Sequence, residues 1–283
     1  NQTVKFTDLF KMTKDLNADA LATGHYEQRV EGENGVELHR GDDHEKDQSY
    51  FLCQLTQDQL AKPLFPIGHF QKIEVREIAR KLNLVTAEKK DSQGLCFIGK
   101  VSLPEFLQQR LQTKNGDIIE IPFDFYKDKP APKATISQSE KITYNPSDGE
   151  TVGKHLGAHF FTIGQRKGLS VGGTSEPLFV IDTDIDENIV YVGQGKDHPG
   201  LFRKALKVIR DEHWVRNDMK IKPGVELEVK VRIRYRQPLQ KAKLVSKKDA
   251  MYIFFEQLQF AITSGQFVAW YQGKELVGSG VIF

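Results

Sequence analysis

The second cysteine of the chain, Cys96, has the sequence neighbours that a reactive thiol needs. Gly94 and Gly99 bracket it, and three lysines lie within seven positions of it. Glycines allow a tight, adaptable loop, and nearby cations stabilise the thiolate, which is the nucleophilic form of cysteine. The alternative is a small buried side chain, which the apolar neighbours Leu95 and Phe97 support and which is common for free cysteines. From these residues alone the buried alternative is favoured.

Two other polar groups are weaker candidates for chemistry. His25 follows Gly24 after a short apolar stretch, where a histidine could contact a ligand or act as an acid or base. A capping or core histidine is the alternative. Residues 46–49 (Lys-Asp-Gln-Ser) precede an apolar run and by themselves predict only the start of a helix. Cys53 has no flanking cation or glycine, so we expect it in a core.

Positive charge is concentrated in residues 201–250, which hold 15 Lys and Arg against 6 Asp and Glu, while the whole chain carries only +2. Within this region, residues 225–235 alternate apolar and charged side chains, the period of a half-buried strand. Its polar face carries arginines, and the strand also carries a tyrosine: Arg232, Arg234, Arg236 and Tyr235. Arginine beside an exposed ring suits phosphate contacts and base stacking, so we expect RNA to bind here. A solvated lysine-rich surface is the alternative.

The elements that must position these residues begin with an α/β unit. Residues 5–16 have apolar side chains at helical spacing, and 20–22 form a short apolar strand candidate followed by Gly24. This order is typical of α/β domains, in which ligands bind beyond the carboxyl ends of the strands. Residues 72–82 predict a second helix, and a capping box predicts a third from Ser102.

Further along the chain the pattern changes to short strands. Residues 123–148 are rich in Pro, Ser and Lys without periodicity, which predicts a long surface excursion. Strands are predicted at 177–181, 189–192, 225–235, 251–255, 267–271 and 275–282. Regularly spaced antiparallel strands favour a small barrel or sandwich at the C-terminus.

The composition excludes several classes of protein. With 39% hydrophobic and 28% charged residues among 283, the chain can build real cores, and we expect two or three domains. Two cysteines exclude a disulfide scaffold and a cysteine-rich zinc module, and they favour a reducing compartment, the cytoplasm. The sequence has no apolar run of membrane-spanning length, metal-ligand spacing, Ser-His-Asp order or P-loop.

Six strings of residues, each modest alone, occur in a specific order. They are Ala-Thr-Gly-His-Tyr at 22–26, Lys-Asp-Gln-Ser-Tyr-Phe-Leu at 46–52, Lys-Asp-Ser-Gln-Gly-Leu-Cys-Phe-Ile-Gly at 90–99, Thr-Ile-Gly-Gln-Arg-Lys-Gly-Leu at 162–169, Arg-Tyr-Arg-Gln at 234–237 and Ser-Gly-Gln at 264–266. Together they resemble the bacterial-type tRNA-specific 2-thiouridylase family. The likeness covers essentially the whole chain apart from 123–148.

The resemblance implies a fold of three parts. Residues 1–100 would be the C-terminal part of an α/β ATP-pyrophosphatase domain of the adenine-nucleotide alpha-hydrolase type. Residues 101–205 would form a small central mixed domain with 123–148 as an inserted loop. Residues 206–283 would form an antiparallel β-barrel that binds tRNA.

The resemblance also implies an ATP-dependent sulfurtransferase acting on the wobble uridine of tRNA. The family adenylates the C2 oxygen of uridine, delivers sulfur from a cysteine persulfide, and uses a second cysteine through a transient disulfide. Cys96 matches the persulfide-bearing cysteine, and Gly24 matches a glycine beside ATP. The positions that match tRNA-contacting residues are His25, Lys46, Asp47, Gln48, Arg234, Tyr235 and Gln266. We expect ATP with Mg²⁺, tRNA and a sulfur-relay persulfide donor protein as partners, and neither membrane nor DNA.

Two departures from the family pattern bear on activity. The family's ATP loop, Ser-Gly-Gly-x-Asp-Ser, does not occur in this sequence, and its other catalytic cysteine would lie one residue before Asn1. We therefore expect a fragment that can neither adenylate nor thiolate alone and that can still bind tRNA. A non-catalytic RNA-binding module, with Cys96 inert, is the second hypothesis. A small-molecule ATP pyrophosphatase resembling argininosuccinate synthase is the third, and the basic strand argues against it.

Overall fold

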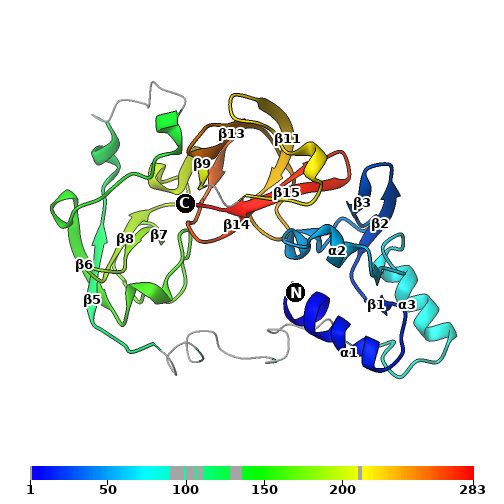
Figure 1. Cartoon of the computed structure of the whole chain (residues 1–283). Helices are drawn as coiled ribbons and strands as arrows, with labels where there is room; N and C mark the ends of the chain where they lie inside the picture. The colour runs from blue at the N-terminus through cyan, green and yellow to red at the C-terminus, as the bar shows by residue number, and fades with distance from the viewer. Residues whose placement is uncertain (1, 90–98, 100–105, 107–110, 128–135, 210–211) are drawn as a thin grey trace. The chain divides into compact units, whose positions relative to one another are not determined.

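The computed structural model describes residues 2–89, 99, 106, 111–127, 136–209 and 212–283 (Figure 1). Cys96 and the start of the helix predicted from Ser102 lie outside these ranges. The chain divides into two compact units. The first unit combines Asn1–Lys89, Lys207–Gln257 and Ser264–Phe283, and the second combines Lys90–Leu206 with Leu258–Thr263. No helix in the described part of the chain is long and apolar enough to cross a membrane.

The N-terminal part of the first unit has the predicted helix and strand. Wide π-type turns over Val4–Leu9 continue into α1 (Phe10–Asp15), which confirms the helix predicted at 5–16. Strand β1 (Leu21–Ala22) confirms the short strand and pairs in parallel with β4 (Pro63–Leu64). Between them lies the short helix α2 (Gln57–Leu60), capped by Thr56.

Helix α3 (Lys72–Lys81) confirms the helix predicted at 72–82. Its start is fixed by a capping box in which the Glu74 carboxylate accepts from the Gln71 N–H at 2.6 Å. None of its residues is buried, although the spacing predicts an apolar face. The helix therefore has little packing to hold it beyond its caps and its own hydrogen bonds.

A hairpin that the sequence analysis did not predict joins this region to the barrel. Strands β2 (Glu27–Gly32) and β3 (Gly35–Arg40) pair antiparallel around a tight turn that ends at Asn34-Gly35. Strand β3 then pairs with β15 (Glu275–Val281), since Glu275 lies opposite His39. The Asn-Gly dipeptide is a strong hairpin signal and could have revealed the turn.

The barrel sheet has nine strands in the order β2-β3-β15-β14-β11-β12-β13-β9, and β10 pairs with β15. Figure 1 labels β9, β11, β13, β14 and β15 in the barrel. The remaining strands are β9 (Phe202–Ile209), β10 (His213–Trp214), β11 (Glu226–Arg232), β12 (Gln240–Ser246), β13 (Ala250–Phe260), β14 (Phe267–Gln272) and β15 (Glu275–Val281). The strands predicted at 251–255, 267–271 and 275–282 are confirmed.

The strand predicted at 225–235 ends three residues early. The Gln237 side chain accepts the Ile233 N–H at 2.9 Å, and the Gln237 N–H closes a turn on the Arg234 carbonyl at 3.2 Å. Arg236 has φ of 66°, in the left-handed region, so the backbone cannot continue as a strand there. The interpretation of three arginines on one polar strand face is therefore wrong. Arg234 and Tyr235 lie in a turn.

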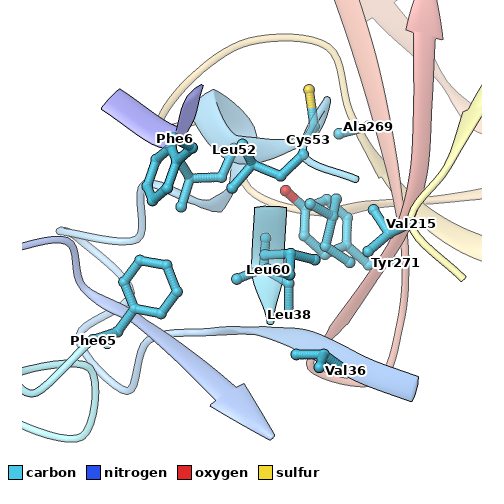
Figure 2. Packing of buried hydrophobic residues seen from close by; sticks show 12 residues of the cluster. Phe6, Val36, Leu38, Leu52, Cys53, Leu60, Phe65, Val215, Ala269 and Tyr271 are labelled. Carbon is cyan, nitrogen blue, oxygen red and sulfur yellow. The ribbon is translucent and has the colours of Figure 1, made fainter. Parts of the chain in front are cut away.

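The core of the first unit packs the N-terminal region against the barrel. Figure 2 shows Phe6 and Phe65 from the N-terminal region in the same cluster as Val215 and Tyr271 from the barrel side. Leu38, Leu52, Leu60 and Tyr271 are fully buried within it. Burying side chains of this size stabilises each by about 1.5–3 kcal/mol, so these two regions hold one another in place.

The second unit is built on a four-stranded sheet in the order β6-β5-β8-β7. Its strands are β5 (Gly116–Glu120), β6 (Glu150–His155), β7 (Leu178–Asp184) and β8 (Ile189–Gln194). The strands predicted at 177–181 and 189–192 are thus confirmed. Ile118 and Ile119 point to opposite faces and belong to two different core clusters, so the sheet is covered on both sides.

The segment 123–148 is not only a surface excursion. In its described part, short 3₁₀ turns occur at Phe123–Tyr126, Ile136–Ser139 and Pro146–Asp148. Tyr144 is buried and packs with Ile181 and Tyr191 of the sheet. The low periodicity hid this contribution because isolated aromatic residues, rather than a repeated apolar face, make the contact.

Candidate nucleic-acid interface

Asp47 is the centre of a buried charge network between the 46–52 segment and the barrel. Its side chain has no exposed surface, and its Oδ2 lies 2.7 Å from Arg40 Nε and 3.0 Å from Arg232 Nη2. Its Oδ1 accepts from the Ser49 amide at 3.0 Å and from the Ser49 hydroxyl at 2.6 Å. Burial alone would raise the pKa of Asp47, but these hydrogen bonds and the Arg232 charge hold it below its usual value.

This network changes the roles expected for two residues. Arg232 is 3% exposed, so it is a buried partner of Asp47 rather than a surface cation. Asp47 has no surface left for a ligand, so in this structure it orders the segment that carries Lys46 and Gln48. The alternating pattern missed this because the partner carboxylate is far away in the sequence.

A second carboxyl group lies close to Asp47, and its pKa is shifted in the opposite direction. Glu27, at the start of β2, has no exposed surface. Burial, and then the negative charge of Asp47, raise the pKa of Glu27 well above its ordinary value. Glu27 is therefore held towards its neutral form beside a charged aspartate.

Basic side chains line an open hollow of about 520 Å³ above this network. The hollow is lined by Arg40, His44, Glu45, Lys46, Arg232, Arg236, Gln237, Pro238 and Leu239. Asp47 balances only one of the two arginines that it binds, and Glu45 opposes the pair Lys46 and Arg236. A net positive surface remains, which suits a phosphate group.

The 3₁₀ turn Ser49–Leu52 joins the predicted tRNA-binding segments. The Tyr50 hydroxyl lies 3.2 Å from the carbonyl oxygen of Ile233 and 2.8 Å from that of Phe267. Ile233 is the residue directly before Arg234, and Phe267 is the residue directly after Gln266. The Phe51 ring lies 4.5 Å from the Tyr235 ring. The structure thus gathers Lys46, Gln48, Arg234, Tyr235 and Gln266 around one turn.

Gly24 and His25 lie in a different setting, at the exit of β1. His25 is 6% exposed, with its ring 5.9 Å from Phe6 and 6.2 Å from Phe65, and its Nδ1 lies 2.9 Å from the Thr23 hydroxyl. Burial, and then the charge of Lys5, lower the pKa of His25 to about 4. This favours the core histidine over an acid or base at neutral pH. Its contact with tRNA stays a prediction.

Gly24 offers room for a ligand. It is exposed, and apart from its two chain neighbours no atom of the described residues lies within 4 Å of the place where a Cβ would stand. The space beside its backbone, at the carboxyl end of β1, is therefore open to a nucleotide. A role in ATP binding stays a prediction.

Cys53 is a core residue, as expected. It is 2% exposed, and burial raises the pKa of its thiol to about 11. Ser279 donates to the Cys53 carbonyl at 2.6 Å, which fixes the backbone here against β15. Cys96 lies outside the described residues.

Among the described residues, three side chains could together hold a cation: Glu37, His39 and Glu275. Arg216 Nη1, however, lies 2.8 Å from the Glu37 carboxylate and 3.4 Å from that of Glu275. Because Arg216 already pairs with both carboxylates, the group is a structural network and does not support the Mg²⁺ expected with ATP.

Comparisons with known proteins cover most of the chain. Residues 1–100 match the "tRNA methyl transferase HUP domain", 133–194 the "tRNA methyl transferase PRC-barrel domain" and 204–282 the "Aminomethyltransferase beta-barrel domain". This confirms the predicted fold of an α/β domain, a central domain and a β-barrel. The exact boundaries of the domains stay a prediction.

Relatives named tRNA-specific 2-thiouridylase MnmA match the whole chain. The relative from Christiangramia forsetii is 58% identical and that from Flavobacterium johnsoniae 56%, and the chain covers 74% of each. A relative from Streptococcus thermophilus is 40% identical, with 69% of it covered. These matches confirm the resemblance inferred from the six motifs. The chain belongs to the tRNA-specific 2-thiouridylase family, a family of tRNA sulfurtransferases.

Proposed function

We propose that this chain acts in the ATP-dependent 2-thiolation of the wobble uridine of tRNA and that the basic hollow beside Ser49–Leu52 holds the tRNA. The observation that carries the proposal is the convergence on one turn of Lys46, Gln48, Arg234, Tyr235 and Gln266. In this proposal Lys46 and Arg234 contact phosphate. The ion pairs of Asp47 with Arg40 and Arg232 hold the segment that carries Lys46 in place.

The proposed reaction has three steps: adenylation of the uridine, transfer of sulfur to C2, and release of the thiolated base. The uridine C2 oxygen attacks the α-phosphorus of ATP and pyrophosphate leaves, so that AMP becomes the leaving group at C2. The terminal sulfur of a Cys96 persulfide then attacks C2 and AMP departs. A second thiol attacks the Cys96 sulfur, which breaks the bond to the transferred sulfur and forms a disulfide. Cys53 does not fit this last role, because its thiol is buried and its pKa is raised.

The co-substrate and partners follow from the same proposal. ATP would approach the open backbone at Gly24, and Mg²⁺ would balance its phosphates. A persulfide donor protein would load Cys96. The cytoplasmic location and the inactivity of this chain alone stay predictions.

Labelling of the two cysteines separates this proposal from a non-catalytic RNA-binding module. At neutral pH the buried Cys53 should react slowly with a thiol reagent, so fast labelling of the folded chain reports on Cys96. A thiol at Cys96 that labels fast and accepts sulfur from a persulfide donor supports the enzyme. An inert Cys96 favours the module.

The interface is tested by tRNA binding at two salt concentrations. Wild-type chain should bind with a steep salt dependence, because several phosphate contacts release counterions. Arg234→Ala/Tyr235→Ala should weaken binding at least tenfold. Lys207→Ala/Phe283→Ala is the matched control, since it removes another cation and ring pair, 5.4 Å apart, from the same unit. Equal losses in both variants, or no binding by wild type, would contradict the proposed interface.

A further inference from the structure

Two aromatic rings lie together at the edge of the basic hollow. Phe51 is 47% exposed, and its ring lies 4.5 Å from that of Tyr235 at an angle of 41°. Tyr235 is itself partly exposed, and the Arg236 guanidinium lies 5.3 Å from its ring. Because Arg236 also lines the hollow, the ring pair and the cationic surface are continuous.

The local structure explains why Phe51 points outward. In a 3₁₀ turn residues three apart share a face, and Ser49 and Leu52 are both buried. Tyr50 is held inward by its hydroxyl contacts with the Ile233 and Phe267 carbonyls. Phe51 is left on the outer side of a turn that is fixed at both neighbours, so its ring is presented with little freedom to turn inward.

The ring pair has the chemistry of a base-stacking surface. Packing of the two rings against each other leaves nearly half of Phe51 in water. An unpaired nucleobase can cover such a surface, whereas its phosphate requires cations close by. Arg236 and Lys46 supply those cations in the adjoining hollow.

We propose that Phe51 is a nucleobase-stacking residue that works as a pair with Tyr235. An unpaired base of the tRNA stacks on the two rings while its phosphate lies in the hollow lined by Arg40, Lys46 and Arg236. This inference rests on the proposed function and adds a residue that the motifs did not mark as a contact. Stacking on a ring face reads no base edge, so the surface should accept different bases.

The test compares Phe51→Leu and Phe51→Trp in tRNA binding. Phe51→Leu keeps an apolar side chain but removes the ring, and it should weaken binding about tenfold, which corresponds to about 1.4 kcal/mol, because the stacking of one base is lost. The salt dependence should not change, because no phosphate contact is lost. Phe51→Trp should keep the affinity, and its fluorescence should be quenched by tRNA. The native Trp214 and Trp270 are buried, so the new indole is the exposed one.

Phe283→Leu and Phe283→Trp are the matched controls, since Phe283 is also exposed and lies beneath Lys207. They should leave affinity unchanged and show no quenching. If wild type binds tRNA with a steep salt slope while Phe51→Leu binds equally well, the stacking role is wrong and the proposed function stands. If wild type does not bind, both are overturned. Unfolding of each variant in urea shows whether a loss of binding reflects a loss of fold.

Discussion

Two buried aspartates, one in each unit, are surrounded in different ways. Asp47 has no exposed side-chain surface and binds two arginines that are themselves 15% and 3% exposed. Asp182, on β7, binds one lysine, Lys141, at 2.5 Å, and that lysine is 46% exposed. The pKa of Asp47 is lowered, whereas burial raises the pKa of Asp182 against the opposing effect of Lys141.

The difference shows what each charge does for the fold. Asp47 connects three elements, because Arg40 ends β3, Arg232 ends β11 and Ser49 begins the turn with the predicted tRNA contacts. Asp182 binds the 136–148 segment to β7 through Lys141, whose side chain is about half exposed to water. The first network orders the segment that is proposed to contact tRNA, whereas the second holds a loop.

The largest expected effect comes from Asp47→Asn. The change leaves Arg232 buried without a counter-charge, and two further nitrogens of Arg232 have no partner in the described part of the chain. Breaking a buried pair of this kind costs about 3–5 kcal/mol, so the free energy of unfolding should fall by that amount and tRNA binding should be lost. Asp182→Asn should cost about 1 kcal/mol or less, since Lys141 is half solvated. Hydrogen exchange of β11 and β7 amides measures both, and equal losses would contradict the comparison.

Local patterns in the sequence predicted two of the three α-helices and seven of the fifteen strands in the described part of the chain. Apolar runs located β7, β8 and the strands from β13 to β15, because these runs are buried in the sheets. The apolar period also located α3, although the structure leaves its apolar face unburied. The hairpin β2–β3 was missed although Asn34-Gly35 indicated its turn.

The site could be predicted only in part. The motifs named Lys46, Arg234 and Tyr235, but not the contacts that bring them together. Tyr50 contacts carbonyls, and Phe51 a ring, that lie roughly two hundred positions away in the sequence. Arg232 follows the polar period of its strand yet is buried, because a distant carboxylate compensates it. Such pairings depend on tertiary structure, and no local pattern contains them.

The next effect concerns pH and compares Glu27 with its neighbour Asp47. The folded-state pKa of Glu27 lies above its ordinary 4.5, so above that pH the unfolded chain loses a proton that the native chain keeps. Stability therefore falls as pH rises, by up to about 1.4 kcal/mol per pH unit until the folded pKa is reached. Asp47 has a folded pKa below 3.8, so its contribution is present above that pH and is lost in acid.

Glu27→Gln tests this sign directly. The variant removes the buried acid, so its stability relative to wild type should increase as the pH rises above 4.5, until the folded-state pKa of Glu27 is reached. Urea unfolding followed by the fluorescence of Trp214 and Trp270 reports on this unit. A relative stability that does not change over this range would show that Glu27 titrates normally.

The smallest expected effect distinguishes a hydroxyl that stabilises only the fold from one that also positions the proposed tRNA contacts. Tyr50→Phe removes a hydroxyl that contacts two carbonyls, and Tyr126→Phe in the second unit removes a hydroxyl 2.7 Å from that of Tyr144. Burial raises the pKa of each phenol to about 12, so both hydroxyls are protonated at neutral pH. Each variant should lose about 1 kcal/mol of unfolding free energy.

Only Tyr50→Phe should also weaken tRNA binding, by a few fold. The lost hydroxyl loosens the backbone beside Arg234 and Gln266, so the residues proposed to contact tRNA remain present but are less well positioned. Because no charge is removed, the salt slope should equal that of wild type. A loss of affinity in Tyr126→Phe of the same size would mean that binding follows overall stability. An unchanged affinity in Tyr50→Phe would mean that the turn at 234–237 keeps its geometry through Gln237 alone.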